Sequence, residues 1–303
     1  MGFTDTRHIL PRAIRVILGI KLSTMKRILV PVDFSDYSEY ALQVAAEIAH
    51  LENAEIVVVH MLGLSDAVFT KSETEEVFDV LQYMELTHKK FESFLKKEYL
   101  EGIEVHVTVR NYRKFHELNE VAAEWQADLI VMGSHGLSGI GDVFVGSNTE
   151  KVIRSSEVPV LVVKKREKDF QIRQAVFVTD FNEESVQPYK DIRRFLKLFG
   201  CEPRLLHVNL PEKFSSTSEI LAKSSRFIQN AEVDNPEIFD MVDLISDYTL
   251  ESGIFNYTAE RDVDLLIVPT HGRKGLAHFF YGSAGESIAN HSTVPVMTMK
   301  IPN

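Results

Sequence analysis

Several residues in the first half of this chain are suited to holding a phosphorylated ligand. Asp33 directly follows a short apolar run, and residues 133–136 (Gly-Ser-His-Gly) follow another, with Gly146 and Ser147 nine residues beyond them. Glycine lets backbone N–H groups approach an anion closely because no Cβ intervenes. A helix starting near Ser147 would add free N–H donors and the positive end of its dipole. The pattern predicts a phosphate site made mostly of backbone, with Asp33 placed to accept hydrogen bonds from ribose hydroxyls or a base amine.

The elements that must position these residues alternate along the chain. Apolar runs such as 56–59 and 129–132 are typical of strands buried on both faces. Between such runs, helical patterns occur at 37–51, 73–98, 117–126 and 150–155. Strand–helix alternation predicts an α/β fold with a parallel sheet covered by helices on both faces. Ligands bind such sheets at the carboxyl ends of strands, beside a point where the strand order reverses.

The whole pattern occurs twice. Asp33 and Asp180 are 147 positions apart, and so are His60 and His207, whereas Gly146 and its counterpart at position 282 are 136 apart. The copies therefore stay in register, and the second lacks a net 11 residues (147 − 136) in its middle. This tandem duplication predicts one domain over residues 25–166 and a second over residues 167–303.

Residues 1–24 form a separate extension with a net charge of +3, from four basic residues and Asp5. Its apolar run 13–20 is interrupted by Arg15 and is too short to span a bilayer, so we expect no integral membrane segment. Two interpretations remain open. The segment is either an upstream extension or early start codon, or a basic amphipathic helix that rests on a membrane or a partner.

Composition excludes several classes of protein. Lys and Arg number 33 against 44 Asp and Glu, a net charge of −11, which argues against a protein built to grip nucleic acid or an anionic membrane. Apolar residues make up 45% and charged residues 25%, as in ordinary globular domains. The single cysteine, Cys201, excludes an internal disulfide and is consistent with a reducing, cytoplasmic location.

These motifs together resemble those of the universal stress protein family. They are V-P-x-D-x-S from Val30, D-L-I-V-M-G-S-H-G from Asp128, and two glycines three apart followed after nine residues by Gly-Ser. The resemblance extends over residues 25–165 and again over 171–300. It implies an α/β fold with two tandem Rossmann-like (adenine nucleotide alpha hydrolase-like) domains, each a five-stranded parallel sheet flanked by helices. Members that carry the glycine motif bind ATP or AMP.

The resemblance also implies roles for individual residues of the first copy. Asp33 and the backbone of Met61 would hold adenine or ribose, and the glycine loop with the following helix start would cradle the phosphates. The implied ligand is ATP, or else AMP or ADP, with or without Mg²⁺. The full set of implied binding residues is Pro31, Val32, Asp33, Met61, Met132, Gly133, His135, Gly136, Gly146, Ser147, Asn148 and Thr149.

The second copy departs from the motif. Pro269 stands where the first copy has Gly133, and proline donates no N–H. Ala284 and Gly285 replace the pair Asn148 and Thr149. We expect a degenerate site that binds weakly, binds another anion or binds nothing. Its implied residues are Asp180, Val208, Gly272, Gly282 and Ser283.

Three functions are consistent with the sequence. The first is a nucleotide-binding regulatory protein of the stress response, and the second is a slow ATPase, for which no catalytic residue is assigned. The third is an interaction scaffold that works without nucleotide and binds a protein partner of unknown identity. The apolar last strands, 160–163 and 296–299, are expected to pair within the chain as a pseudo-dimer, and a homodimer is a further option.

Overall fold

The computed structural model describes residues 25–62, 85–111, 117–134, 147–166, 170–233, 235–270 and 284–301. The extension 1–24 lies outside these ranges. So do six of the predicted site residues: His135, Gly136, Gly146, Gly272, Gly282 and Ser283.

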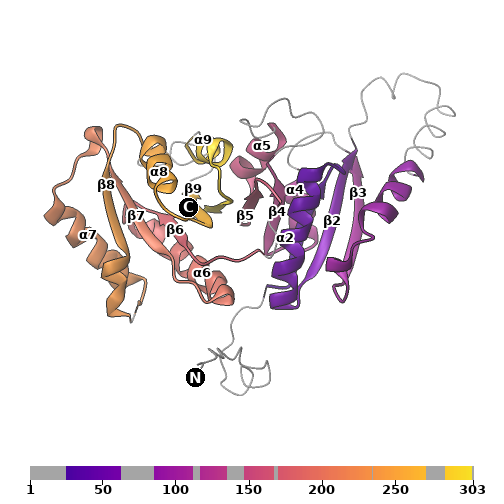
Figure 1. Cartoon of the computed structure of the whole chain (residues 1–303), viewed down its shortest axis with the longest axis horizontal. Helices are drawn as coiled ribbons and strands as arrows, with labels where there is room; N and C mark the ends of the chain where they lie inside the picture. The colour runs from indigo at the N-terminus through magenta and orange to yellow at the C-terminus, as the bar shows by residue number, and fades with distance from the viewer. Residues whose placement is uncertain are drawn as a thin grey trace, which may run out of the picture.

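Each copy contributes five strands (Figure 1). Those of the first copy are β1 (Arg27–Val32), β2 (Glu55–Leu62), β3 (Val105–Asn111), β4 (Leu129–Gly133) and β5 (Val160–Val163). Those of the second are β6 (Ala175–Val178), β7 (Arg204–Asn209), β8 (Val242–Ser246), β9 (Leu265–Thr270) and β10 (Val296–Lys300). All neighbouring strands within a copy run parallel, which confirms the predicted fold class.

The two copies share one sheet. The strand order is β3-β2-β1-β4-β5-β10-β9-β6-β7-β8, and β5 pairs with β10 antiparallel, with Leu161 opposite Met297. Leu161 is completely buried and Met297 nearly so. The last strands therefore cover each other's apolar edges inside one chain, the intrachain pairing that their composition predicts.

Helices cover both faces of this sheet. Those of the first copy are α2 (Asp36–Glu52), the helical residues 85–94, α4 (Glu117–Glu124) and α5 (Ser147–Ser155). Those of the second are α6 (Val186–Leu196), α7 (Thr217–Asn230), α8 (Leu250–Ala259) and α9 (Ala284–His291). Short 3-10 turns occur at Glu98–Leu100, Glu183–Ser185, Lys197–Phe199, Pro211–Lys213 and Pro236–Met241.

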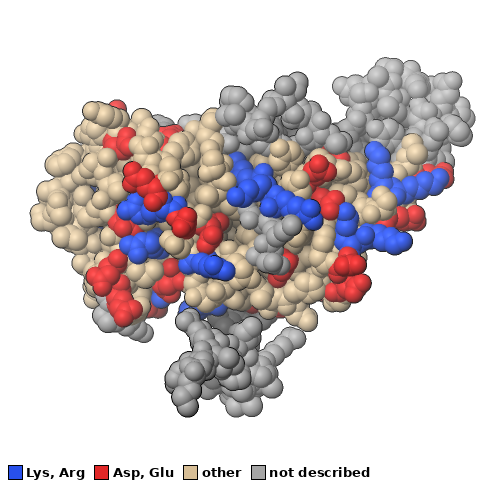
Figure 2. Space-filling view, in the orientation of Figure 1, with Lys and Arg blue, Asp and Glu red and all other residues tan. Residues whose placement is uncertain are grey.

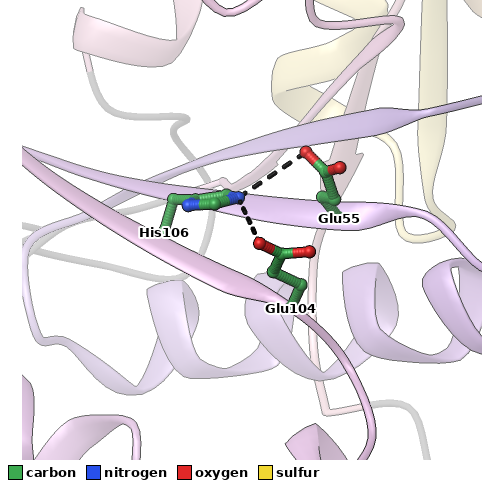
Figure 3. A group of neighbouring side chains, drawn as sticks. All are labelled: Glu55, Glu104 and His106. Atoms are coloured by element: carbon green, nitrogen blue, oxygen red, sulfur yellow. Dashed lines mark ion pairs between the residues drawn. The ribbon is translucent and has the colours of Figure 1, made fainter.

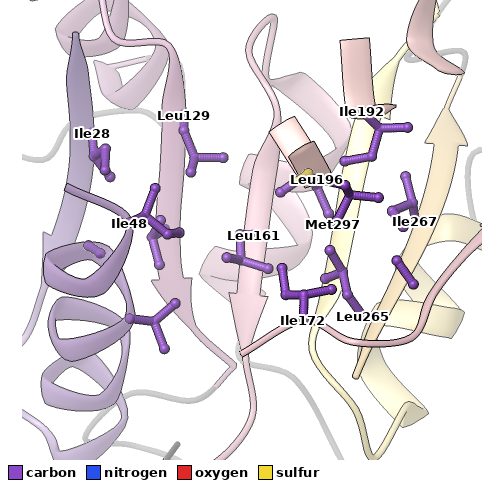
Figure 4. Close-up of a cluster of buried hydrophobic side chains, with 14 of the residues drawn as sticks. Ile28, Ile48, Leu129, Leu161, Ile172, Ile192, Leu196, Leu265, Ile267 and Met297 are labelled. Atoms are coloured by element: carbon purple, nitrogen blue, oxygen red, sulfur yellow. The ribbon is translucent and has the colours of Figure 1, made fainter. Parts of the chain in front are cut away.

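The buried side chains form one core on each face. One core contains α2, residues 85–94, α6 and α7, and the other contains α4, α5, α8 and α9. The first core runs without interruption from one copy to the other, from Ile28 and Leu129 through Leu161 to Ile192 and Leu265 (Figure 4). Because the core is continuous across the β5–β10 pair, the two copies pack as a single body.

The helix bounds differ in places from the helical patterns of the sequence. Helix α5 starts at Ser147, as the phosphate motif predicts, although its helical pattern begins only at residue 150, and the helix expected over 73–98 ends at residue 94 within its described part. The earlier start of α5 matters for the site because it brings the first turn of this helix directly behind the end of β4. There the hydroxyl of Thr149 donates to the carbonyl of Gly133 at 3.1 Å.

Candidate functional site

The strand order places the predicted residues at a switch point. In the first copy, β1 lies between β2 and β4. The helix after β1, α2, covers one face of the sheet, and the helix after β4, α5, covers the other. Connections that leave neighbouring strands in opposite directions open a crevice at the carboxyl ends of those strands. Asp33 follows β1 at this crevice, and Gly133 and Ser134 end β4 beside it.

The Asp33 carboxylate is partly exposed and is oriented by the residue two positions later. Its Oδ1 accepts hydrogen bonds from the Ser35 backbone N–H at 3.1 Å and from the Ser35 hydroxyl at 2.5 Å. Ser35 is at the same time the N-cap of α2, where its oxygen accepts from the Ser38 N–H at 3.3 Å. One serine therefore caps the helix and fixes the carboxylate, so Asp33 does not itself serve as the cap of α2.

Phe34, between these two residues, has a left-handed backbone with φ of 66°. Its ring packs against His60 at 4.6 Å, Phe91 at 5.0 Å and Phe94 at 5.5 Å between ring centroids. The second copy repeats the conformation at Phe181, with φ of 61°. The sequence patterns did not predict this turn, although the Asp-Phe pair that appears in both copies was a usable signal.

His60 and His207 have a structural role near the ends of β2 and β7. The Nδ1 of His60 lies 2.7 Å from the carbonyl of Val32, and that of His207 lies 3.0 Å from the carbonyl of Thr179. Because a carbonyl only accepts, Nδ1 carries the proton in both rings. Burial lowers the pKa of each histidine below its ordinary value, so both rings are neutral at pH 7.

Gly133 has a packing role that its sequence context did not reveal. A Cβ at this position would lie 2.7 Å from the backbone oxygen of Tyr37 and 2.9 Å from its Cβ, in the first turn of α2. Only glycine allows α2 to approach β4 this closely. The buried Thr149 then ties the same residue to α5, so the end of β4 is held between the two helices that flank the crevice.

The remaining described residues of the first-copy set surround this point. Met132 is buried in β4, and Met61 is half-buried near the end of β2. Val32 is buried at the end of β1, and Pro31 precedes it. Ser147 and Asn148 form the first turn of α5. The structure thus brings Asp33, Met61, Gly133 and the start of α5 to the same end of the sheet.

The second copy has the same layout with a different environment. Asp180 is only 8% exposed, and burial raises the pKa of its carboxyl above the ordinary value. Its two oxygens accept hydrogen bonds from Asn182, Oδ1 from the backbone N–H at 3.1 Å and Oδ2 from the side-chain amide. With no serine cap at this turn, the helix opens as the 3-10 turn Glu183–Ser185 and becomes α6 only at Val186.

The other predicted residue of the second copy that is described is Val208, which is fully buried in β7. Gly253 of α8 packs on it so closely that a Cβ there would lie 2.7 Å from Val208 Cγ1. Any contact of Val208 with a ligand would therefore have to come from its backbone.

One group of potential metal ligands lies within the described residues, at the amino ends of the strands (Figure 3). His106 Nε2 is 3.6 Å from Glu55 Oε2 and 3.5 Å from Glu104 Oε1. Arg27 Nε also contacts Glu55 Oε2 at 2.7 Å, and this hydrogen bond is the main cause that lowers the pKa of the Glu55 carboxyl. We interpret the group as an ion-pair network, because Arg27 already neutralises its central carboxylate and the crevice lies at the opposite ends of the strands.

Surface charge is mixed on the face of the molecule seen in Figure 1. Figure 2 shows basic and acidic residues interspersed over this face, without a broad area of either sign. In the part of the chain that the structure covers, no helix has both the length and the apolar content needed to cross a membrane.

Comparisons with known proteins agree with the repeat and with the fold. The model of the universal stress protein family matches residues 24–164 and 171–300. A universal stress protein of Methanocaldococcus jannaschii is 33% identical over 150 residues, which cover 48% of this chain and 85% of that protein. A solved universal stress protein from Archaeoglobus fulgidus superimposes with a TM-score of 0.64 at 21% identity, covering 91% of this chain and 98% of that one. A solved universal stress protein in complex with cAMP is 23% identical, with a TM-score of 0.32, and covers 46% of this chain and 97% of that one.

Proposed function

The chain belongs to the universal stress protein family, and on this premise we propose that it is a regulatory protein that binds one adenine nucleotide per chain, in its first copy. The nucleotide is ATP, AMP or ADP. Asp33 accepts hydrogen bonds from its ribose hydroxyls or base amine. The glycine loop that ends at Gly146 and the start of α5 hold its phosphates.

The observation that carries this proposal is the contrast between Asp33 and Asp180. Both carboxylates follow a central strand at a switch point. Asp33 is partly exposed, whereas Asp180 is buried and accepts hydrogen bonds on both oxygens from Asn182. An acceptor for ligand hydroxyls must be accessible, and the burial of Asp180 leaves its carboxylate little room for a ligand. The first copy is therefore the better binding site.

The start of α5 supports the same assignment. A helix of nine residues begins at Ser147, directly after the glycine loop, and its free N–H groups favour an anion. At the matching position of β9 the second copy carries Pro269, which has no N–H to donate. The motif differences and the difference in burial thus both favour the first copy.

Calorimetric titration of the full chain with ATP tests the proposal. We expect one site per chain. Asp33→Asn should weaken binding by roughly tenfold or more, the equivalent of one charge-assisted hydrogen bond. Asp180→Asn is the matched control, because it makes the same chemical change in the other copy, and it should leave the affinity unchanged.

Other outcomes would contradict the proposal in distinct ways. Two sites per chain, one of them lost in Asp180→Asn, would show that both copies bind. Absence of binding to ATP, ADP, AMP and cAMP would favour a scaffold that works without nucleotide. As an independent measurement, mass spectrometry of the small molecules released from denatured protein should find about one adenine nucleotide per chain if a tightly held nucleotide copurifies.

A further inference from the structure

We propose that Phe34 is a positioning residue for the nucleotide site, which it serves by holding the Asp33 carboxylate toward the ligand. The inference rests on the proposed function and deepens it, because it concerns how this site is built. Phe34 itself is not expected to touch the nucleotide. Its effect is carried by the backbone turn that it imposes between Asp33 and Ser35.

The conformation of Phe34 is unfavourable in isolation. At φ of 66° a bulky side chain meets its own backbone, which is why glycine and asparagine dominate this region. Such strain persists only where the surroundings over-determine it, and it is concentrated at ligand clamps and active sites. Phe34 therefore needs specific contacts that outweigh the strain.

Those contacts come from two separate elements. The ring packs against His60 of β2 and against Phe91 and Phe94 of the helical residues 85–94. His60 also holds the strand before the turn, since its Nδ1 donates to the carbonyl of Val32 at 2.7 Å. The protein thus holds the turn at two residues: Val32, which precedes it, and Phe34, its left-handed residue.

The left-handed residue has a direct geometric consequence for Asp33. It reverses the chain, so that the backbone N–H of Ser35 points back at Asp33 Oδ1 at 3.1 Å and the Ser35 hydroxyl joins it at 2.5 Å. Phe34 therefore helps to fix the orientation of the Asp33 carboxylate at the crevice, through the two contacts that Ser35 makes with Oδ1.

The second copy provides an independent occurrence of the same arrangement. Phe181 has φ of 61°, packs against His207 at 5.3 Å and Phe227 at 5.8 Å, and is followed by a backbone N–H that donates to Asp180 at 3.1 Å. The arrangement is thus a property of this repeat. It also supplies a control position in the copy where we expect no nucleotide.

A double-mutant cycle tests the proposal in the full chain, with ATP as the probe. Phe34→Ala removes the ring contacts but keeps a Cβ, which disfavours a φ of 66°, so the turn is released; it should weaken ATP binding by roughly tenfold. In the Asp33→Asn background the same substitution should cost nothing further, because Phe34 acts only through Asp33. Phe34→Tyr keeps the ring and should retain the affinity of the wild type.

Phe181→Ala makes the matching change in the second copy and should leave ATP affinity unchanged. Losses that add in the Phe34→Ala/Asp33→Asn double variant, or unchanged affinity in Phe34→Ala, would refute the positioning role. Should Phe34→Ala fail to fold, Phe34→Leu, which keeps apolar bulk without the aromatic contacts, is measured in the same cycle. A wild-type chain that does not bind ATP would refute the proposed function itself.

Discussion

Replacing Gly133 by alanine tests whether helix packing, rather than ligand contact, requires the glycine at the end of β4. The new methyl group would lie 2.7 Å from the Tyr37 backbone oxygen, and ordinary contact begins at 3.4 Å, so α2 would have to retreat by about 0.7 Å (3.4 − 2.7). That helix is not free to move, because Ala41, Leu42 and Ile48 on its inner face are completely buried. Overpacking of this kind costs about 1–3 kcal/mol of unfolding free energy.

The chain offers a convenient probe for this measurement. Trp125 is its only tryptophan and lies in the first copy, just after α4, so its fluorescence during urea denaturation reports the copy that carries the substitution. We expect Gly133→Ala to lower the unfolding free energy that Trp125 reports by about 1–3 kcal/mol. Pro269→Ala changes the matching position of the second copy, where a Cβ is already present. It should leave the unfolding free energy that Trp125 reports unchanged.

Stability and ATP affinity measured on the same variant separate a packing role of Gly133 from a ligand-binding role. If Gly133→Ala left the Trp125 transition unchanged but abolished ATP binding, the glycine would be required by the ligand and not by α2. If stability and affinity both fell, the variant would be consistent with packing, since a displaced α2 would carry Ser35 and the Asp33 turn with it.

Two further predictions concern the histidines and the junction between the copies. Because burial lowers the folded-state pKa of His60 and His207, the unfolded chain binds more protons below pH 6.5, so unfolding free energy should fall as the pH drops through that value. In His60→Gln the Trp125 transition should depend less on pH between 5 and 7.5, and an unchanged slope would contradict the assignment. At the junction, Leu161→Lys places a charge at a fully buried position of the β5–β10 pair and should separate the copies, at a cost of several kcal/mol. Small-angle scattering should then detect a larger radius of gyration, whereas an unchanged radius would show that other contacts hold the copies together.

Much of the fold could be predicted from the sequence because its signals are local. Alternating apolar runs and helical patterns predicted the strands and helices, and matching offsets such as Asp33 to Asp180 predicted two copies in register. Parallel strands have their carboxyl ends at one edge of the sheet, so Asp33 and Gly133 could be predicted to lie at the same edge. The hydrogen-bonding role of His60 could also be predicted, from its place at the end of a strand.

The properties that distinguish the two copies depend on tertiary structure. Asp33 and Asp180 follow matching strands and are both followed by phenylalanine, but the first is partly exposed and the second is buried. The reason for glycine at position 133 is the backbone of Tyr37, almost a hundred positions earlier in the chain. The left-handed turn at Phe34 likewise depends on ring contacts with β2 and with residues 85–94. Burial, close approach and strain arise between segments far apart in sequence, so local patterns predict where a site lies, and packing decides which copy is accessible.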